Sequence, residues 1–103
     1  MYLYNLESKN YFKMIKNNSD VVIGIYENNC IISDLFKGIL NKINDLTGRD
    51  IIVCLIEKNE FFKLNIKEDK NILPLILVYK NGEIINKILG LSNYNKIISE
   101  ICY

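Results

Sequence analysis

The fold of this chain is decided by residues 21–46, which read VVIGIYENNCIISDLFKGILNKINDL. The stretch opens with Val21 to Tyr26, a run that is apolar on both faces, as expected for a strand buried at the centre of a sheet. After Asn28 and Asn29, apolar residues recur at spacings of three and four from Ile32 to Leu46, which predicts an amphipathic helix with Asn29 as its N-cap. A buried strand that leads into an amphipathic helix is the start of a βαβ unit.

Outward from this stretch, apolar runs and turn signals predict the remaining elements. The expected strands are Tyr2 to Leu6, Ile51 to Ile56, Leu75 to Tyr79 and Glu83 to Leu89, with a hairpin turn at Asn81-Gly82. The expected helices are Ser8 to about Asn17, capped by Ser8 with Tyr11, Phe12 and Ile15 on one face, a weak helix over Asn59 to Ile66, and a last helix after Gly90 and Ser92. This order predicts one α/β domain over residues 1–103, with a mixed central sheet flanked by helices on both faces.

Composition excludes several classes of function. Lys plus Arg is 13 and Asp plus Glu is 12, so the net charge of +1 favours neither nucleic acid nor an anionic membrane as a partner. The three cysteines, Cys30, Cys54 and Cys102, form neither a disulfide framework nor a Cys-x-x-Cys pair. Since there is also no histidine, we expect no zinc or other metal site, no bound cofactor and no imidazole-based triad.

Cellular location is also suggested by the sequence. No apolar run reaches the length that spans a bilayer, and residues 1–7 carry no basic segment followed by a long apolar stretch. We therefore expect a cytoplasmic protein with reduced thiols.

Four local motifs stand in register and resemble the thioredoxin family. Residues 25–33, IYENNCIIS, resemble the strand-loop-helix that presents the thioredoxin Cys-x-x-Cys site. Leu73-Pro74 resembles the family's cis-proline loop, Tyr79 to Glu83 its Phe-Lys-Asn-Gly-Glu hairpin, and Gly90 the glycine that ends its last strand. The resemblance covers nearly the whole chain. It implies the thioredoxin fold, a cis bond between Leu73 and Pro74, and a Pro74 that lies beside Cys30.

The departures from this family concern the second half of disulfide exchange. Ser33 replaces the second, resolving cysteine. The other departures are Asn29 for a tryptophan, Ile31-Ile32 for Gly-Pro, Gly24 for a buried aspartate, Leu55 for the lysine associated with that aspartate, and Leu75 for a threonine. A site of the form Cys-x-x-Ser can form a mixed disulfide, but it needs an external thiol to resolve that disulfide.

Cys30 is the candidate nucleophile. It falls in the first turn of the predicted helix, where unpaired N–H groups and the helix dipole favour a thiolate, and Ser33 can donate its hydroxyl hydrogen to the sulfur. In the opposite direction, Asp34 adds a negative charge and the two isoleucines can bury the sulfur and raise its pKa. A free cysteine is also often only a small packed residue. We interpret Cys54, in the middle of a strand, as such an inert core residue.

Two interpretations of function follow. In the first, Cys30 and Ser33 carry thiol–disulfide exchange with a protein, a peptide or a low-molecular-weight thiol, and Asn29, Leu73, Pro74 and Leu75 form the substrate groove. In the second, the groove is an apolar contact surface of a binding module that catalyses nothing. A cluster-binding protein like the monothiol glutaredoxins is disfavoured, because their Cys-Gly-Phe-Ser motif does not match Ile31.

Overall fold

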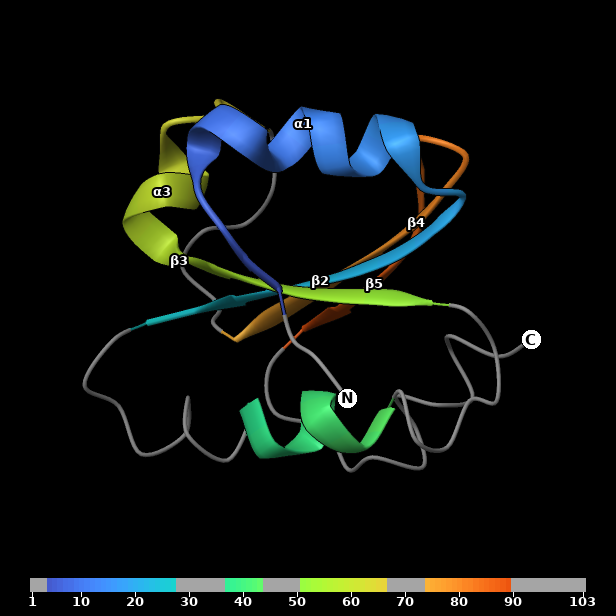
Figure 1. The fold of residues 1–103 in the computed structure, drawn as a ribbon. Coiled ribbons are helices and arrows are strands. Elements are labelled where there is room, and N and C mark those ends of the chain that lie inside the picture. Colours follow the sequence, from blue (N-terminus) through green and yellow to red (C-terminus); the bar gives the residue numbers. More distant parts are fainter. Residues whose placement is uncertain (1–3, 28–36, 44–50, 67–73, 90–103) are drawn as a thin grey trace.

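Five strands form a single mixed sheet. The computed structural model describes residues 4–27, 37–43, 51–66 and 74–89. The strands are β1 (Tyr4–Leu6), β2 (Asp20–Tyr26), β3 (Ile52–Glu57), β4 (Leu75–Lys80) and β5 (Glu83–Leu89), in the spatial order β1-β3-β2-β4-β5. β1 and β2 both run parallel to β3, while β4 is antiparallel to β2 and to β5 (Figure 1). The expected α/β architecture with a mixed sheet is confirmed.

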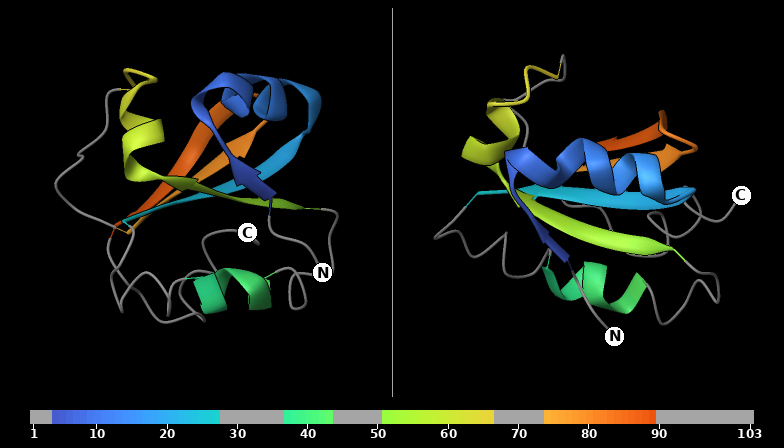
Figure 2. Two further views of the ribbon diagram at one scale, coloured as in Figure 1. Left: turned by 60° about the vertical axis from the view of Figure 1, so that its left-hand side comes forward. Right: turned by 45° about the horizontal axis from the view of Figure 1, so that its top comes forward.

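Helices cover both faces of the sheet. α1 (Ser8–Asn17) and α3 (Lys58–Phe62) pack on one face, called here the α1 face, and the helical residues 37–43 lie on the other (Figures 1 and 2). Along β2, Val21, Ile23 and Ile25 point to the α1 face, and Val22 points to the opposite face. Since strand side chains alternate, Gly24 belongs to the same face as Val22. The continuous apolar run in β2 thus reflects burial on both sides.

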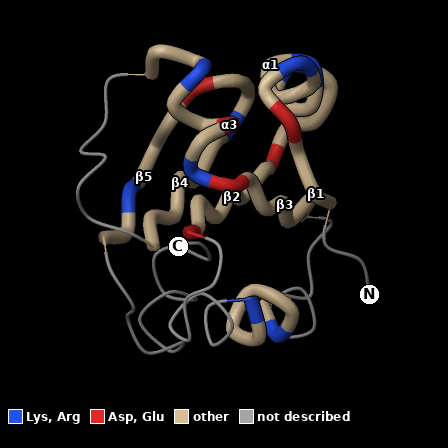
Figure 3. Tube along the Cα trace, turned by 90° about the vertical axis from the view of Figure 1, so that its left-hand side faces the viewer, with Lys and Arg blue, Asp and Glu red and all other residues tan. Residues whose placement is uncertain are grey.

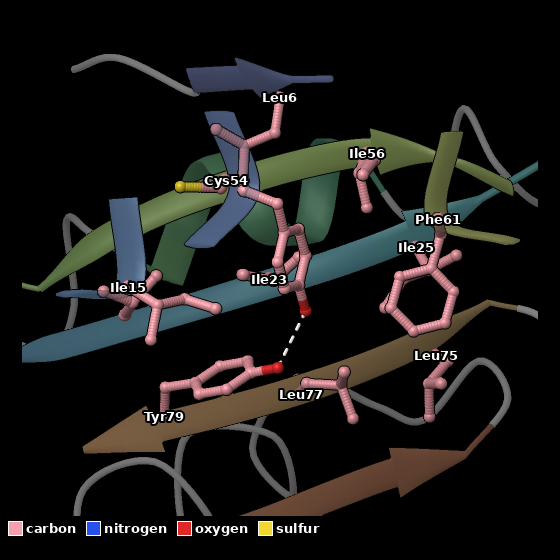
Figure 4. Close-up of a cluster of buried hydrophobic side chains, with 12 residues drawn as sticks. Leu6, Ile15, Ile23, Ile25, Cys54, Ile56, Phe61, Leu75, Leu77 and Tyr79 are labelled. Carbon is pink, nitrogen blue, oxygen red and sulfur yellow. Dashed lines mark hydrogen bonds between the residues drawn. The ribbon is translucent and has the colours of Figure 1, made fainter. Parts of the chain in front are cut away.

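The core of the α1 face contains a buried pair of phenols. The hydroxyl oxygens of Tyr11 on α1 and Tyr79 on β4 lie 2.9 Å apart and share a hydrogen bond (Figure 4). The Tyr11 ring also packs against Phe61 of α3, with ring centroids 6.1 Å apart. A buried hydroxyl without a partner is costly, so this bond lets two polar atoms join an otherwise apolar cluster. It ties α1 to the sheet across 68 residues of sequence.

Two expectations about α1 are wrong. The N-cap is Glu7, whose backbone N–H donates to Asn10 Oδ1 at 2.8 Å, and Ser8 is the first helical residue. Phe12 is not on the buried face, because its side chain is 58% exposed while Tyr11 and Ile15 are buried. With about 100° of rotation per residue, the stripe set by Tyr11 and Ile15 leaves Phe12 at its margin.

The hairpin forms as predicted. Asn81 and Gly82 have φ of 52° and 85°, the positive values that a two-residue turn of this kind requires. The Asn81 N–H donates to the Ser19 carbonyl at 2.8 Å, which fastens the turn to the loop between α1 and β2. The hairpin tip therefore lies beside the C-terminal end of α1.

The third expected helix is shorter than the sequence suggested. α3 ends at Phe62 instead of continuing to Ile66, and Asn65 has a positive φ of 57° that a helix does not allow. Phe61 is buried and Phe62 packs at the margin of the same cluster, as expected for core residues. In the long helix expected after Asn29, residues 37–43 are helical with Leu40 and Ile43 buried. The rest of that helix and the last helix lie outside the described residues.

Glu60 links α3 to the start of α1. Its carboxylate accepts hydrogen bonds from Lys63 Nζ, from the Ser8 N–H at 2.9 Å and from the Ser8 hydroxyl at 3.2 Å. The Lys63 bond, followed by the Ser8 N–H, lowers the pKa of Glu60 from 4.5 to about 2. Because the folded-state pKa lies below the ordinary value, the stabilising effect is complete above that ordinary value and is lost as the pH falls toward 2.

We therefore predict that Glu60→Gln reduces the acid sensitivity of folding. The free energy of unfolding of the wild type should fall more steeply between about pH 5 and pH 2 than that of Glu60→Gln. Urea unfolding at several pH values measures this difference. The control is Glu83→Gln, at the exposed start of β5, which should keep the wild-type pH dependence. Equal slopes for the wild type and Glu60→Gln would contradict the assignment.

Candidate functional site

The candidate site lies at the end of the sheet where β2 finishes and β4 begins. Ile25 is the antiparallel partner of Leu75, and Tyr26 is the parallel partner of Glu57. Pro74 directly precedes β4, so it lies beside the carboxyl end of β2. The expected site residues Asn29, Cys30, Ser33 and Leu73 lie outside the described residues, and so do the bond between Leu73 and Pro74 and the expected position of Pro74 beside Cys30.

Two expected groove residues are described, and both are buried. Pro74 is buried, and the side chain of Leu75 is only 1% exposed, in the α1-face cluster with Ile25 and Phe61 (Figure 4). The expectation that Leu75 adds an apolar side chain to an open contact surface is therefore wrong. Strand alternation explains this, because Leu75 shares its face with Leu77 and Tyr79.

The floor behind this end of the sheet is apolar. Gly24 in β2 is the Cα partner of Leu55 in β3 and of Ile76 in β4. All three are buried, and Leu55 and Ile76 belong to the cluster that also contains Leu40 and Ile43. Gly24 and Leu55 are the positions where the resemblance implies an aspartate and a lysine, and the strand register makes them neighbours. Neither residue can accept or supply a proton here.

Charged groups surround the carboxyl ends of β2 and β3. Lys58 Nζ bonds Glu27 Oε1 at 2.6 Å, which raises the pKa of Lys58. Lys37 Nζ lies 4.3 Å from the ring centroid of Tyr26, within the range of a cation–π contact. Burial, and after it the carboxylate of Glu57, raises the pKa of Tyr26. Sequence reasoning missed these contacts because their partners are 11 and 31 residues apart, and no local pattern pairs them.

Cys54 is a core residue, as predicted. It lies at the middle of β3, fully buried on the α1 face, with Tyr4 and Ile23 as its Cα partners (Figure 4). Burial raises the pKa of the Cys54 thiol to about 12. Since the thiolate is the species that attacks disulfides and electrophiles, Cys54 is a poor nucleophile in the folded chain.

The described part of the chain offers neither a cluster of metal ligands nor a membrane span. Within residues 4–27, 37–43, 51–66 and 74–89, no three His, Cys, Asp or Glu side chains come together to hold a metal ion. In the same ranges, no helix is both long and apolar enough to cross a bilayer.

Comparison with solved structures identifies the fold. The chain superposes on the oxidised thioredoxin of Plasmodium falciparum with a TM-score of 0.83 and 15% identity, over 99% of this chain and 100% of that one. For mitochondrial thioredoxin 3 of Saccharomyces cerevisiae the TM-score is 0.81 with 21% identity, over 96% and 92%. A third match is a chain from a structure of the thiol resolving mechanism of yeast mitochondrial 1-Cys peroxiredoxin. Its TM-score is 0.75 with 21% identity, over 96% of this chain and 92% of that one.

These likenesses show that the chain has the thioredoxin fold. No protein-family model matches the sequence, and no curated protein matches it either. At the identities found, the structural likeness assigns no activity and no residue role to this chain.

We predict that Cys54 reacts with thiol reagents only when the protein unfolds. In the double variant Cys30→Ser/Cys102→Ser, alkylation at pH 8 should be at least about 1000-fold slower in buffer than in denaturant, since a pKa of about 12 instead of 9.0 leaves about a thousandth of the thiolate. Mass spectrometry of the alkylated protein over time measures the two rates. Labelling of the folded protein at a rate near that of a free thiol would contradict the buried assignment.

Proposed function

We propose that this chain is a thioredoxin-fold protein that exchanges one thiol at a time through Cys30. The observation that carries the proposal is the pairing of Gly24 with Leu55 behind the carboxyl end of β2. Both groups that would assist a resolving thiol are replaced by apolar atoms in adjacent strands, and Ser33 replaces the resolving thiol itself. The three replacements all affect the second half-reaction, in which a resolving thiol attacks the mixed disulfide. The first half-reaction, in which Cys30 attacks the substrate disulfide, needs none of the replaced groups.

The proposed chemistry has two steps. The Cys30 thiolate attacks one sulfur of a protein or peptide disulfide, so a new S–S bond forms, the old one breaks, and the departing thiolate takes a proton from water. A low-molecular-weight thiol, as its thiolate, then attacks the mixed disulfide, which frees Cys30 and leaves that thiol joined to the sulfur that it attacked. Ser33 donates a hydrogen bond to the Cys30 thiolate. We propose the cytoplasm as its location, where such thiols are abundant.

A binding module without turnover is the second candidate. The apolar surroundings formed by Gly24, Leu55 and Ile76 are compatible with it as well. Binding a partner without a reaction requires no group that transfers a proton, and these residues supply none. The pKa of Cys30 separates the two candidates. Alkylation rates against pH, in a variant with Cys54 and Cys102 replaced, should give a pKa below the ordinary 8.5 for a catalytic thiol. A pKa above that value supports the binding module.

We predict that the protein fails as a stand-alone disulfide reductase. With insulin as substrate and no added thiol, it should form mixed disulfides and stop after about one equivalent, because no second thiol resolves them. Non-reducing electrophoresis measures the adduct. The adduct should disappear in Cys30→Ser and remain in the control Cys102→Ser. Sustained turnover without an added thiol would contradict the proposal.

We also predict that restoring the second cysteine is not enough for fast turnover. In Ser33→Cys the two sulfurs should oxidise readily to a disulfide, while reduction of insulin stays slow because Gly24 and Leu55 carry no group that takes the proton from the attacking thiol. Adding Gly24→Asp should recover part of the rate and lower the free energy of unfolding by about 1–3 kcal/mol, since it buries an acid.

The matched control adds Gly24→Ala instead, which introduces a side chain without a carboxylate. It should leave the turnover of Ser33→Cys unchanged. If Ser33→Cys alone is a fully active reductase, the apolar pair at Gly24 and Leu55 does not limit the resolving step. That result would remove the main support for the proposal.

A further inference from the structure

The outer side of α1 is a basic ridge with one aromatic residue. The ridge is defined by Lys9, Phe12, Lys13 and Lys16, all of which are exposed. At about 100° per residue, the three lysines fall within an arc of roughly 60°, and Phe12 borders it. α1 contains no acidic residue, and Figure 3 views the helix along its axis with lysine positions on the side away from the sheet.

Within the part of the chain that the structure describes, the positive charge of the ridge is barely neutralised. Lys9 lies 3.8 Å from Glu7, but the two side chains are 77% and 60% exposed, so this pair contributes little. The carboxylate of Glu27 bonds Lys58, and that of Glu60 bonds Lys63 and Ser8, the residue before Lys9.

A depression adjoins the aromatic end of the ridge. It has a volume of about 350 Å³ and is lined by Phe12, Ile15, Lys16, Asn81 and Gly82. Lys16 and Asn81 also border a second, more polar depression with Asn17, Asn18 and Ser19. The bond from the Asn81 N–H to the Ser19 carbonyl holds the hairpin tip in this position. An exposed phenylalanine next to a concave surface can hold an apolar side chain of a partner.

The Phe12 depression lies far from the candidate site, whereas the ridge runs from Lys9, near the carboxyl end of the sheet, to Lys16 beside the hairpin tip. The hairpin tip follows Lys80, whose partner Asp20 is the first residue of β2, whereas Pro74 lies beside the last residues of that strand. At about 3.3 Å per residue, β2 separates the two ends by roughly 20 Å. A partner side chain held in the Phe12 depression would therefore leave the candidate site open.

We propose that the ridge docks an extended acidic segment of a partner protein, with one apolar side chain of that segment in the Phe12 depression. Lys9 to Lys16 spans about 10 Å along the helix axis, which three or four residues of an extended chain cover. Acidic side chains along this short segment then meet the lysines. This proposal goes beyond the thiol chemistry of Cys30 and does not depend on it.

Three other occupants fit the observations less well. An anionic membrane is typically recognised by a cluster of 4–8 basic residues, and the apolar stripe of α1 is already buried against the sheet. Nucleic acid has no stacking aromatic here besides Phe12, which borders a concave depression. A second copy would have to supply an extended acidic segment, and within residues 4–27, 37–43, 51–66 and 74–89 no two acidic residues are adjacent or two positions apart.

The test uses a synthetic decapeptide of glutamates with one central leucine, added to the full ¹⁵N-labelled chain. Amide shifts should change in α1 and around the hairpin tip, and stay constant around Gly24 and Leu75. Lys13→Glu/Lys16→Glu should weaken binding by at least about tenfold, and Phe12→Ala should weaken it by less. The matched control is Lys42→Glu, an exposed lysine on the opposite face of the sheet, which should bind as the wild type does. Binding should also fall as sodium chloride rises, because the charges are exposed.

Several results would overturn the proposal. They are no binding at millimolar peptide, shifts centred on Gly24 and Leu75, or an equal loss of affinity in Lys42→Glu. Tighter binding to phosphatidylserine vesicles or to oligothymidylate than to the peptide, lost in the double variant, would assign the ridge to a membrane or to nucleic acid instead. Because Phe12, Lys13 and Lys16 are exposed, the variants should fold, and the amide spectrum of each one verifies this. Cys30→Ser should bind the peptide normally, so failure of the thiol chemistry and failure of this proposal are distinguishable.

Discussion

The whole structure depends on β2 being buried on both faces and paired on both edges. Val21, Val22, Ile23 and Ile25 are each at most 1% exposed, and such a side chain contributes about 1.5–3 kcal/mol when it leaves water. β3 pairs with one edge of β2 and β4 with the other. A charged side chain in the interior of such a strand lowers the free energy of unfolding, because it is buried away from water. This constraint fixes where the helices pack and leaves the two ends of β2 as the places where polar chemistry can occur.

That constraint explains why so much of the fold could be predicted. Buried strands such as Val21 to Tyr26 and Ile51 to Ile56 appear in the sequence as uninterrupted apolar runs. The Asn-Gly pair favours one kind of tight turn, with positive φ at both residues. These signals are local, so each can be recognised without knowing what packs against it. The mixed sheet and the helices on both faces then follow from the order of the elements.

The errors arise where a residue's role is set by a distant partner. Serine is a common N-cap residue, but Ser8 is the first residue of the helix. Its N–H and its hydroxyl both donate hydrogen bonds to the Glu60 carboxylate, 52 residues away. Phe12 looks like a core residue by type, yet the stripe that faces the sheet is decided by Tyr11 and its bond to Tyr79. The position of Leu75 after Pro74 predicts a groove residue, but its face of β4 belongs to the core. Around the candidate site, the structure describes Pro74, Leu75 and the apolar neighbours Gly24, Leu55 and Ile76.

The two ends of β2 differ in a way that suits two separate roles. At the carboxyl end, Glu27 is paired with Lys58 and Lys37 lies against Tyr26, so charges there are largely satisfied within the chain. Behind them lies the apolar floor of Gly24, which favours chemistry that needs no proton carrier. At the amino end, Lys16 and the exposed Phe12 border a depression beside the hairpin tip, and among the described residues no carboxylate pairs with Lys16. Attraction to a partner is an interaction that such a surface can supply. The two proposals fit together: a partner docked by its acidic segment on α1 would raise the local concentration of its disulfide near Cys30, which is what an exchange through a single thiol needs.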